Sequence, residues 1–419
     1  MSEPATGTSK QIIPGAGAGT KRIIDSQLGT GIAAMITCFL FAIILWPIWS
    51  MFWKGIFASL AAQGLATVDA ATQAKLLQVM VEGSFFWMVI NPWIWQTLIM
   101  GNYGKDKFGA KQPVAGIWYV LVAWVSGILV YLALIGFLGI WWKPFSLGLM
   151  LMPQTAADVA LAIEGWEAAN FFALAVIIAQ IPFASLLHKW PFAGTSKQPI
   201  EGLSVLFFSS LVTFIVWMAL IVPSFLHPVI DGHHITVQPF GSWPTFVAFC
   251  QAFVFFAIMP AEGAEGYPMK FFAKKQPYMA IAGLLIALAA GLTIPNLLRP
   301  IVEPLNLLPG APVDAAVASL ELSVVVFMLV WHHLFDDYPS AAMVPGAAAR
   351  ICTRIAIWLV GGIICGVVWL KTFMFLPYGA NNMGLGYPTM GFLAGQFAFL
   401  MAVLMYNTFM DKWPWVQKS

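Results

Sequence analysis

Apolar runs of about 20 residues fill most of this chain, and they restrict its fold more than any other feature. Hydrophobic residues make up 60% of the 419 residues, whereas Asp, Glu, Lys and Arg together make up only 9%. Soluble domains carry about 25% charged residues. A helix of roughly 20 apolar residues is long enough to cross the ~30 Å hydrocarbon core of a bilayer. The sequence therefore predicts an all-α, polytopic integral membrane protein in contact with lipid.

We expect about ten transmembrane helices within one domain, residues 30–411. Residues 1–29 are expected to form a disordered tail and residues 412–419 a second, short tail. Polar residues interrupt the segment 57–80, which predicts a helix lying on the membrane surface, and a loop with Asp158 and Glu164 is expected before the fourth span. The expected spans are residues 31–53, 83–101, 114–142, 168–187, 203–225, 243–261, 278–298, 315–334, 351–375 and 387–410.

A step from an aromatic residue to proline recurs at nearly equal intervals and predicts an internal repeat. Each step ends one apolar run, and a later Gln-Pro or Val-Pro step opens the next. We therefore expect repeated helical hairpins, which are common in membrane transport folds. This repeat would bring residues 188, 265 and 336 together. The steps are Trp190-Pro191, Tyr267-Pro268, Tyr338-Pro339 and Trp413-Pro414, and Tyr103 matches them with Gly104 in place of proline.

The segment 331–339 places two histidines and two aspartates at the end of an apolar run. His332 precedes Asp336 by four residues, and His333 likewise precedes Asp337, so each pair should stack one turn apart on a helix. Ionisable groups at membrane depth are costly and indicate a functional site. Polar residues at equivalent helix ends complete a predicted cluster of His188, Glu262, Glu265, His332, His333, Asp336, Asp337 and Asp411.

Several interpretations of this cluster remain open. Imidazole and carboxylate ligands together suit a transition metal ion such as Fe, Cu or Zn, whereas chains of Asp, Glu and His also carry protons or cations through membranes. The polar residues can equally mark where helices leave the lipid. An acid at a helix C-terminus meets the negative end of the helix dipole, at a cost of roughly 0.3–1 kcal/mol. Glu265, Asp336 and Asp411 therefore imply a compensating cation: a metal, a transported ion, or nearby Lys and Arg.

A second group of histidines lies in the loop between the fifth and sixth expected spans. Three histidines and one aspartate within a short segment could hold Cu or Zn. The alternative is an exposed polar loop. The residues are His227, Asp231, His233 and His234.

Single polar residues within the expected spans are candidates for lining a substrate or ion path. Such residues also form hydrogen bonds between helices, which is the structural alternative. Glu321 differs from the others, because it is an acid about three turns before His332. Gly362 and Gly366 have a spacing that permits close helix approach, and ordinary small-residue content explains the pair equally well. The path candidates are Asn91, Gln96, Gln180, Gln251 and Glu321.

The distribution of Lys and Arg predicts the orientation. With ten spans, both termini and the aromatic-proline turns share one side, which carries all the Lys and Arg residues except Lys54, Lys75, Lys143, Arg299 and Lys371. Cytoplasmic loops are enriched in these residues. The sequence therefore predicts a bacterial-type inner (plasma) membrane protein with both termini in the cytoplasm.

Three functions follow from these features. The main prediction is a membrane transporter or channel for a small solute or ion, in which the His/Asp/Glu cluster handles protons or cations. One alternative is an integral membrane metalloenzyme of the oxidoreductase type that uses the cluster as metal ligands. The other is a membrane subunit of a larger complex, or of a homo-oligomer, which fits the short loops. The net charge of +2 gives no indication of nucleic-acid binding.

Overall fold

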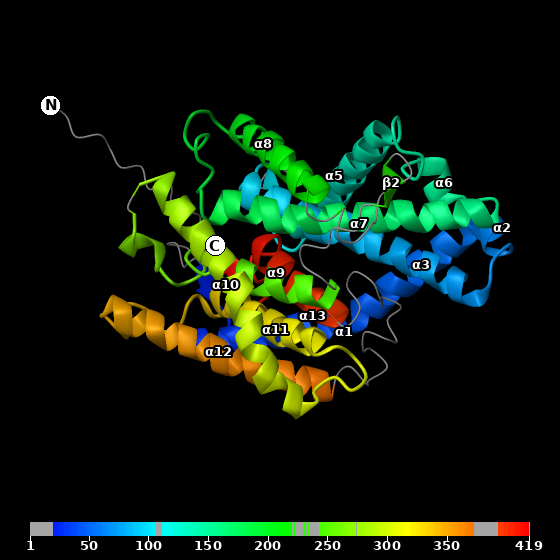
Figure 1. The fold of residues 1–419 in the computed structure, drawn as a ribbon. Coiled ribbons are helices and arrows are strands. Elements are labelled where there is room, and N and C mark those ends of the chain that lie inside the picture. Colours follow the sequence, from blue (N-terminus) through cyan, green and yellow to red (C-terminus); the bar gives the residue numbers. More distant parts are fainter. Residues whose placement is uncertain are drawn as a thin grey trace.

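The computed structural model describes residues 20–105, 111–219, 222, 229–230, 233–234, 243–273, 275–372 and 393–418. In these residues helices dominate, and the only strands form two short antiparallel pairs. Figure 1 shows the helices packed against one another in a single body. The predicted all-α fold is confirmed.

Seven helices of the described residues are long and apolar enough to cross a membrane. Three expected spans coincide instead with shorter helical segments, so ten full-length spans are not confirmed. The seven are α1 (Gln27–Leu60), α5 (Val114–Leu138), α7 (Ala156–Ser185), α8 (Ile200–Val216, extended by a further turn), α10 (Tyr278–Val302), α11 (Val313–Phe335) and α12 (Ala347–Lys371). The shorter segments are α9 (Trp243–Ile258), α13 (Ala394–Thr408) and the stretch that follows α3 (Ala70–Phe85).

The first helix is much longer than the span expected for it. The Ser26 hydroxyl caps its first turn by accepting a hydrogen bond from the Gly29 N–H at 3.2 Å. The 34 residues of α1 extend about 51 Å at 1.5 Å per residue, beyond the ~30 Å of a bilayer core. Consequently the expected surface helix at 57–80 is divided among the end of α1, α2 (Ala62–Leu65) and α3, which Asp69 caps.

The second expected span is not one regular helix. It follows the end of α3 through η1 (Phe86–Ile90), α4 (Asn91–Trp93) and η2 (Ile94–Ile99), of which η1 and η2 are π-helical. Pro92 has no N–H and cannot make the backbone bond of a regular α-helix. The Asn91 N–H instead donates to the Phe86 carbonyl, in a widened turn of the kind frequent at functional sites.

The fourth expected span begins a full three turns earlier than predicted. Thr155 and Asp158 form a capping box, in which the Thr155 hydroxyl accepts from the Asp158 N–H and the Asp158 carboxylate accepts from the Thr155 N–H. Such a box satisfies two helix-terminal donors at once. Residues 156–167, including Asp158 and Glu164, are therefore helical rather than a loop.

Two of the spanning helices form the interior and the others surround them. The apolar windows of α7 and α11 are 72% and 78% buried, against 22–28% for the remaining five. In Figure 1, α7 crosses the upper half of the molecule, and α11 lies beside α12 in the lower half. The outer helices direct large apolar side chains outward, as lipid contact requires.

The glycine pair of α12 lies against α11. A Cβ atom on Gly362 would be 2.5 Å from the Cα atom of Val324, and one on Gly366 would be 2.9 Å from the Ser323 hydroxyl. Only a residue without a side chain permits this approach, so the predicted close helix contact is present.

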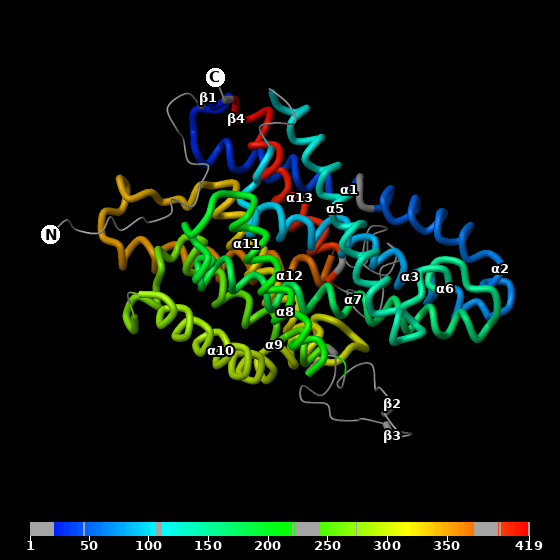
Figure 2. Tube along the Cα trace, turned by 90° about the horizontal axis from the view of Figure 1, so that it is seen from above, coloured from blue at the N-terminus to red at the C-terminus, as the bar shows by residue number. Residues whose placement is uncertain are grey.

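The two described ends of the chain lie side by side (Figure 2). Strand β1 (Thr20–Arg22) pairs antiparallel with β4 (Val416–Lys418). Parts of both expected tails, residues 20–29 and 412–418, therefore belong to the folded structure. The remaining short elements are α6 (Leu147–Leu151), β2 (Val229–Ile230), β3 (His233–His234), η5 (Met269–Phe271) and η6 (Glu303–Leu305).

Five helical segments end in the same backbone conformation. At each end two consecutive residues have positive φ values, which places them in the left-handed region. The first residue of each pair stands two positions before the aromatic residue of the repeated step. The pairs are Gly101–Asn102, His188–Lys189, Glu265–Gly266, Asp336–Asp337 and Asp411–Lys412.

Candidate functional site

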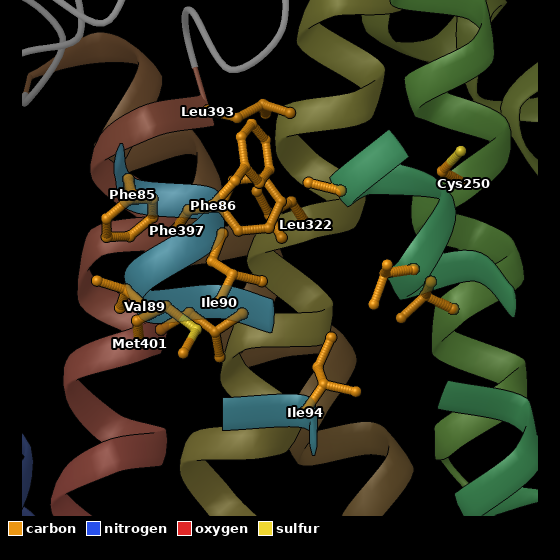
Figure 3. Packing of buried hydrophobic residues seen from close by; sticks show 14 of the residues in the cluster. Phe85, Phe86, Val89, Ile90, Ile94, Cys250, Leu322, Leu393, Phe397 and Met401 are labelled. Carbon is orange, nitrogen blue, oxygen red and sulfur yellow. The ribbon is translucent and has the colours of Figure 1, made fainter. Parts of the chain in front are cut away.

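A cavity of about 740 Å³ lies between η1, η2, α7, α9, α11 and α13. Its larger part is apolar. In Figure 3, Ile90 and Ile94 come together with Leu322 of α11 and with Phe397 and Met401 of α13. Cavities of this size and lining are typical of small-molecule sites.

The other end of the cavity is polar. It is formed where the five helical segments with left-handed turns end, so side chains distant in sequence face one space. The polar side chains that line this end are Thr97, Asn102, Lys105, Ser185, His188, Lys189, Gln198, Glu201, Glu262, His332, His333, Asn407, Thr408 and Asp411.

His332 joins two carboxylates at this end. Its Nε2 lies 3.0 Å from Glu262 Oε2, and its Nδ1 lies 2.9 Å from Asp337 Oδ2. Glu262 lines the cavity, whereas Asp337 lies behind His332. The three groups therefore form a continuous relay that leads away from the cavity; we refer to Glu262, His332 and Asp337 as the carboxylate–histidine relay.

The relay contradicts the predicted helical pairing. Helix α11 ends at Phe335, and Asp336 and Asp337 adopt left-handed conformations. The chain therefore turns back, and His332 meets Asp337 rather than Asp336. His333 in turn does not pair with Asp337, because its Nδ1 contacts the amide of Asn407 at 2.7 Å.

A glycine and an arginine hold Asp337 in place. A Cβ atom on Gly263 would lie 2.5 Å from Asp337 Oδ1, so only glycine lets the turn after α9 approach the carboxylate. Arg354 of α12 donates to the Gly263 carbonyl at 2.8 Å and to the Pro339 carbonyl at 2.9 Å. These bonds tie the turns after α9 and α11 together, and so bring Glu262 to His332.

His333 has one ring nitrogen free. With the Asn407 amide N–H₂ donating to Nδ1, the neutral ring carries its hydrogen on Nε2. His333 Nε2 is buried without a hydrogen-bond partner and is 3.9 Å from Glu262 Oε2. The ring lines the cavity, whereas Nε2 itself is enclosed by protein.

Burial changes the proton affinity of the ionisable groups at this end. It raises the pKa of Glu262, an effect that the neighbouring His332 opposes and Asp337 reinforces. Burial lowers the pKa of His188, and the nearby Lys270 lowers it further. Burial therefore favours the protonated form of Glu262.

The three acids at helix C-termini are compensated by nearby Lys and Arg side chains. Asp336 contacts Arg22 at 2.9 Å and also Lys412. Asp411 accepts from Lys105 at 2.8 Å. Glu265 accepts two bonds from Arg350 and lies near Arg354, and the bonds from Arg350 lower its pKa.

Residues 188, 265 and 336 have different surroundings, although the repeat predicts that they meet. His188 lines the cavity, whereas Glu265 and Asp336 are directed to separate basic partners. Of the predicted cluster, the cavity is lined by His188, Glu262, His332, His333 and Asp411.

The described residues do not provide a set of ligands for the predicted metal sites. Among the described residues, no group of three or more His, Cys, Asp or Glu side chains is placed to hold a metal ion. His227 and Asp231 lie outside the described residues, and only the backbone of His233 and His234 is described.

One of the predicted path residues, Gln251, lines the cavity. Gln180 instead accepts from the Trp95 indole, and Gln96 donates to Ser126. The side chains of Asn91 and Glu321 are buried without hydrogen-bond partners and lie outside the cavity lining. Thr97 and Asn407 were absent from the predicted site, although they occupy the position of His332 in the repeated pattern.

The fold and the site together define a multi-pass integral membrane protein with a cavity between its helices. No protein-family model, curated protein or solved structure matches this chain.

Proposed function

We propose that this protein is a membrane transporter that carries a small, neutral, largely apolar solute, coupled to proton movement through the carboxylate–histidine relay. The observation that carries the proposal is the position of Glu262, which lines the cavity and also contacts His332 at 3.0 Å. A solute in the cavity and a proton on the relay would thus meet at one carboxylate.

The lining of the cavity supports this class of solute. Ile, Leu, Val and Phe side chains surround its larger part, whereas side chains with hydrogen-bonding groups line its polar end. A solute with an apolar body and one hydrogen-bond acceptor matches both features. A solute with a full charge would lose its hydration against an apolar wall, at a high cost.

The relay supports the proton-handling role. A proton that Glu262 accepts from the cavity can pass to His332 Nε2, and His332 then releases its Nδ1 proton to Asp337. The imidazole gains one proton and loses one, so no charge accumulates on it. Chains of carboxylates and histidines have this role in transporters.

We further infer that the chain crosses the membrane ten times in repeated hairpins. The β1–β4 pairing supports an even number of crossings, because it holds both described ends on one side. Seven crossings would place the two ends on opposite sides of the membrane. If α9, α13 and the α3–η2 segment also cross, the number of crossings is ten and the ends share one side. The five equivalent left-handed turns support the repeat, and the Lys and Arg distribution supports a cytoplasmic location of both termini.

Cys250 provides a test, because it lines the cavity and is labelled in Figure 3. A variant with Cys38, Cys352 and Cys365 replaced by alanine leaves Cys250 as the only thiol. We expect an uncharged, membrane-impermeant methanethiosulfonate that carries a sugar group to modify Cys250 from either side of oriented vesicles, with a ratio between the two sides that changes with pH. The modification is measured by intact-protein mass spectrometry.

Glu262→Gln imitates the protonated carboxyl, so it should fix this ratio at its low-pH value. The matched control, Glu303→Gln, changes an exposed acid outside the cavity and should leave the pH dependence unchanged. Failure of the reagent to reach Cys250 from either side at any pH would refute the transport proposal. The metalloenzyme and complex-subunit alternatives have no separate observation in their favour among the described residues.

A further inference from the structure

A second acid lies close to the middle of the most buried helix. Glu321 stands three residues from Val324, the central residue of α11, and thus about 5 Å from the midpoint of the helix axis. The residue is 7% exposed. Helix α11 packs against α1, α9, α10, α12 and α13, so Glu321 is enclosed by protein.

Neither carboxylate oxygen of Glu321 has a hydrogen-bond partner. The polar groups nearest in sequence are already engaged, since Ser319 and Ser323 bond to Gln396 of α13. Arg299 of α10 is held by Asp314 and forms no ion pair with Glu321. Glu321 is therefore separate from every ion pair of the described residues.

An ionised carboxylate is very costly in such surroundings. Moving a charge from water into an apolar interior is strongly unfavourable unless a partner compensates it. Metal cations such as Ca²⁺ and Mg²⁺ require several oxygen ligands, and here the neighbouring hydroxyl groups are bonded to Gln396. A proton needs only the carboxylate itself.

We propose that Glu321 is a proton-binding site inside the membrane, occupied in this conformation and distinct from the cavity. The titratable and charged groups around it are Cys250 on α9, Arg299 on α10 and Asp314 on α11. Release of the proton requires the α10–α11 contact to loosen, so that water or Arg299 reaches the carboxylate.

This site would give α11 two proton-binding groups on one rigid element. Glu321 and His332 are separated by about 16 Å along the helix axis, at 1.5 Å per residue. Their use in one transport cycle rests on the proposed function. The protonation of Glu321 does not, because it follows from burial and the lack of a partner alone.

Dicyclohexylcarbodiimide, which reacts with protonated carboxyl groups in apolar surroundings, tests the proposal. We expect the reagent to modify Glu321 in wild-type protein in lipid vesicles, with a yield that falls as the pH rises. Peptide mass spectrometry locates the adduct. Asp314, which is ion-paired, and Glu303, which is exposed, serve as internal controls and should remain unmodified. The absence of an adduct on Glu321 would overturn the proposal.

A second measurement compares wild type with Glu321→Gln, which imitates the protonated side chain. Unfolding exposes Glu321, which then ionises above about pH 4.3. The folded state keeps the proton, so wild-type stability should fall as the pH rises, and the variant should lose this contribution. The gap between the two apparent unfolding temperatures should therefore widen with pH in favour of the variant. A constant gap would contradict a bound proton, whatever the Cys250 labelling shows about transport.

Discussion

The acids of this protein fall into two kinds at the level of single residues. Glu265, Asp336 and Asp411 end helices and are each bonded to Lys or Arg from another part of the chain. Glu321 has no basic residue in contact, and Glu262 contacts histidine rather than Lys or Arg. The first kind stabilises the turns, and only the second kind is placed to take up and release protons.

The acids that are bonded to Lys or Arg should make the stability of the protein depend on pH. The bonds from Arg350 lower the pKa of Glu265 in the folded state. The stability that this ion pair contributes is therefore complete above the pKa of Glu265 in the unfolded chain, and it is lost as the pH falls through the lower pKa of the folded state. Glu265→Gln leaves the buried Arg350 and Arg354 without their carboxylate. We expect a loss of about 1–3 kcal/mol near neutral pH, measured as a lower apparent unfolding temperature in detergent.

This loss should shrink towards acidic pH, where the wild-type carboxylate is itself protonated. The direction is opposite to that expected for Glu321→Gln, whose advantage grows with increasing pH. Glu303→Gln, at an exposed position, should change neither. A Glu265→Gln variant as stable as wild type at neutral pH would show that the ion pair contributes nothing.

At the scale of elements, interruptions of regular helices create the cavity. The π-helical turns on either side of Pro92 present Ile90 and Ile94 to the interior, and the left-handed turns end five segments around its polar end. The close contact between α11 and α12 supports this arrangement from outside, because Arg354 reaches from α12 to the turn that holds Glu262.

The α11–α12 contact predicts contrasting effects of two Gly→Ala substitutions. The methyl group of Gly362→Ala would lie 2.5 Å from the Val324 backbone, so the helices must separate, at a cost of about 1–3 kcal/mol. In Gly136→Ala, also within a spanning helix, the methyl group has no atom within 4 Å. This control should be neutral, or more stable by up to about 1 kcal/mol.

Thermal unfolding in detergent measures both effects. If Gly362→Ala and Gly136→Ala change the unfolding temperature equally, the close contact does not stabilise the fold.

At the scale of the whole molecule, the two chain ends and the polar end of the cavity are connected. Arg22, the last residue of β1, and Lys412, before β4, both contact Asp336 at the end of α11. Gln27 donates to the carbonyls of Phe335 and Asp336. The turn that carries Asp337 is thus held by residues from both ends of the chain.

This connection predicts where the termini lie. Epitope tags at the N- and C-termini should both be protected in right-side-out vesicles and both be accessible in inverted vesicles, because β1 pairs with β4. Protease protection measures the accessibility, and a tag in the expected outer loop near Pro144, between α5 and α6, serves as the control of opposite orientation. Termini on opposite sides would refute both the strand pairing and the ten-crossing proposal.

The sequence by itself determined the features that follow from local chemistry. Long apolar runs required membrane helices, the Gly362–Gly366 spacing predicted a close helix contact, and the aromatic-proline steps located the turns that prove to be left-handed. Each depends on residues within a few turns of one another, so periodicity and spacing were sufficient to predict them.

Only the tertiary structure decided the partners of the ionisable residues. Helical spacing predicted His332 with Asp336, but the chain reverses at the end of α11, so His332 meets Asp337 and, from α9, Glu262. Likewise, Glu321 and Glu265 are both acids in or beside apolar helices, and only the position of Arg350, 85 residues from Glu265, distinguishes them. Charge compensation acts between residues distant in sequence, so local patterns do not determine it.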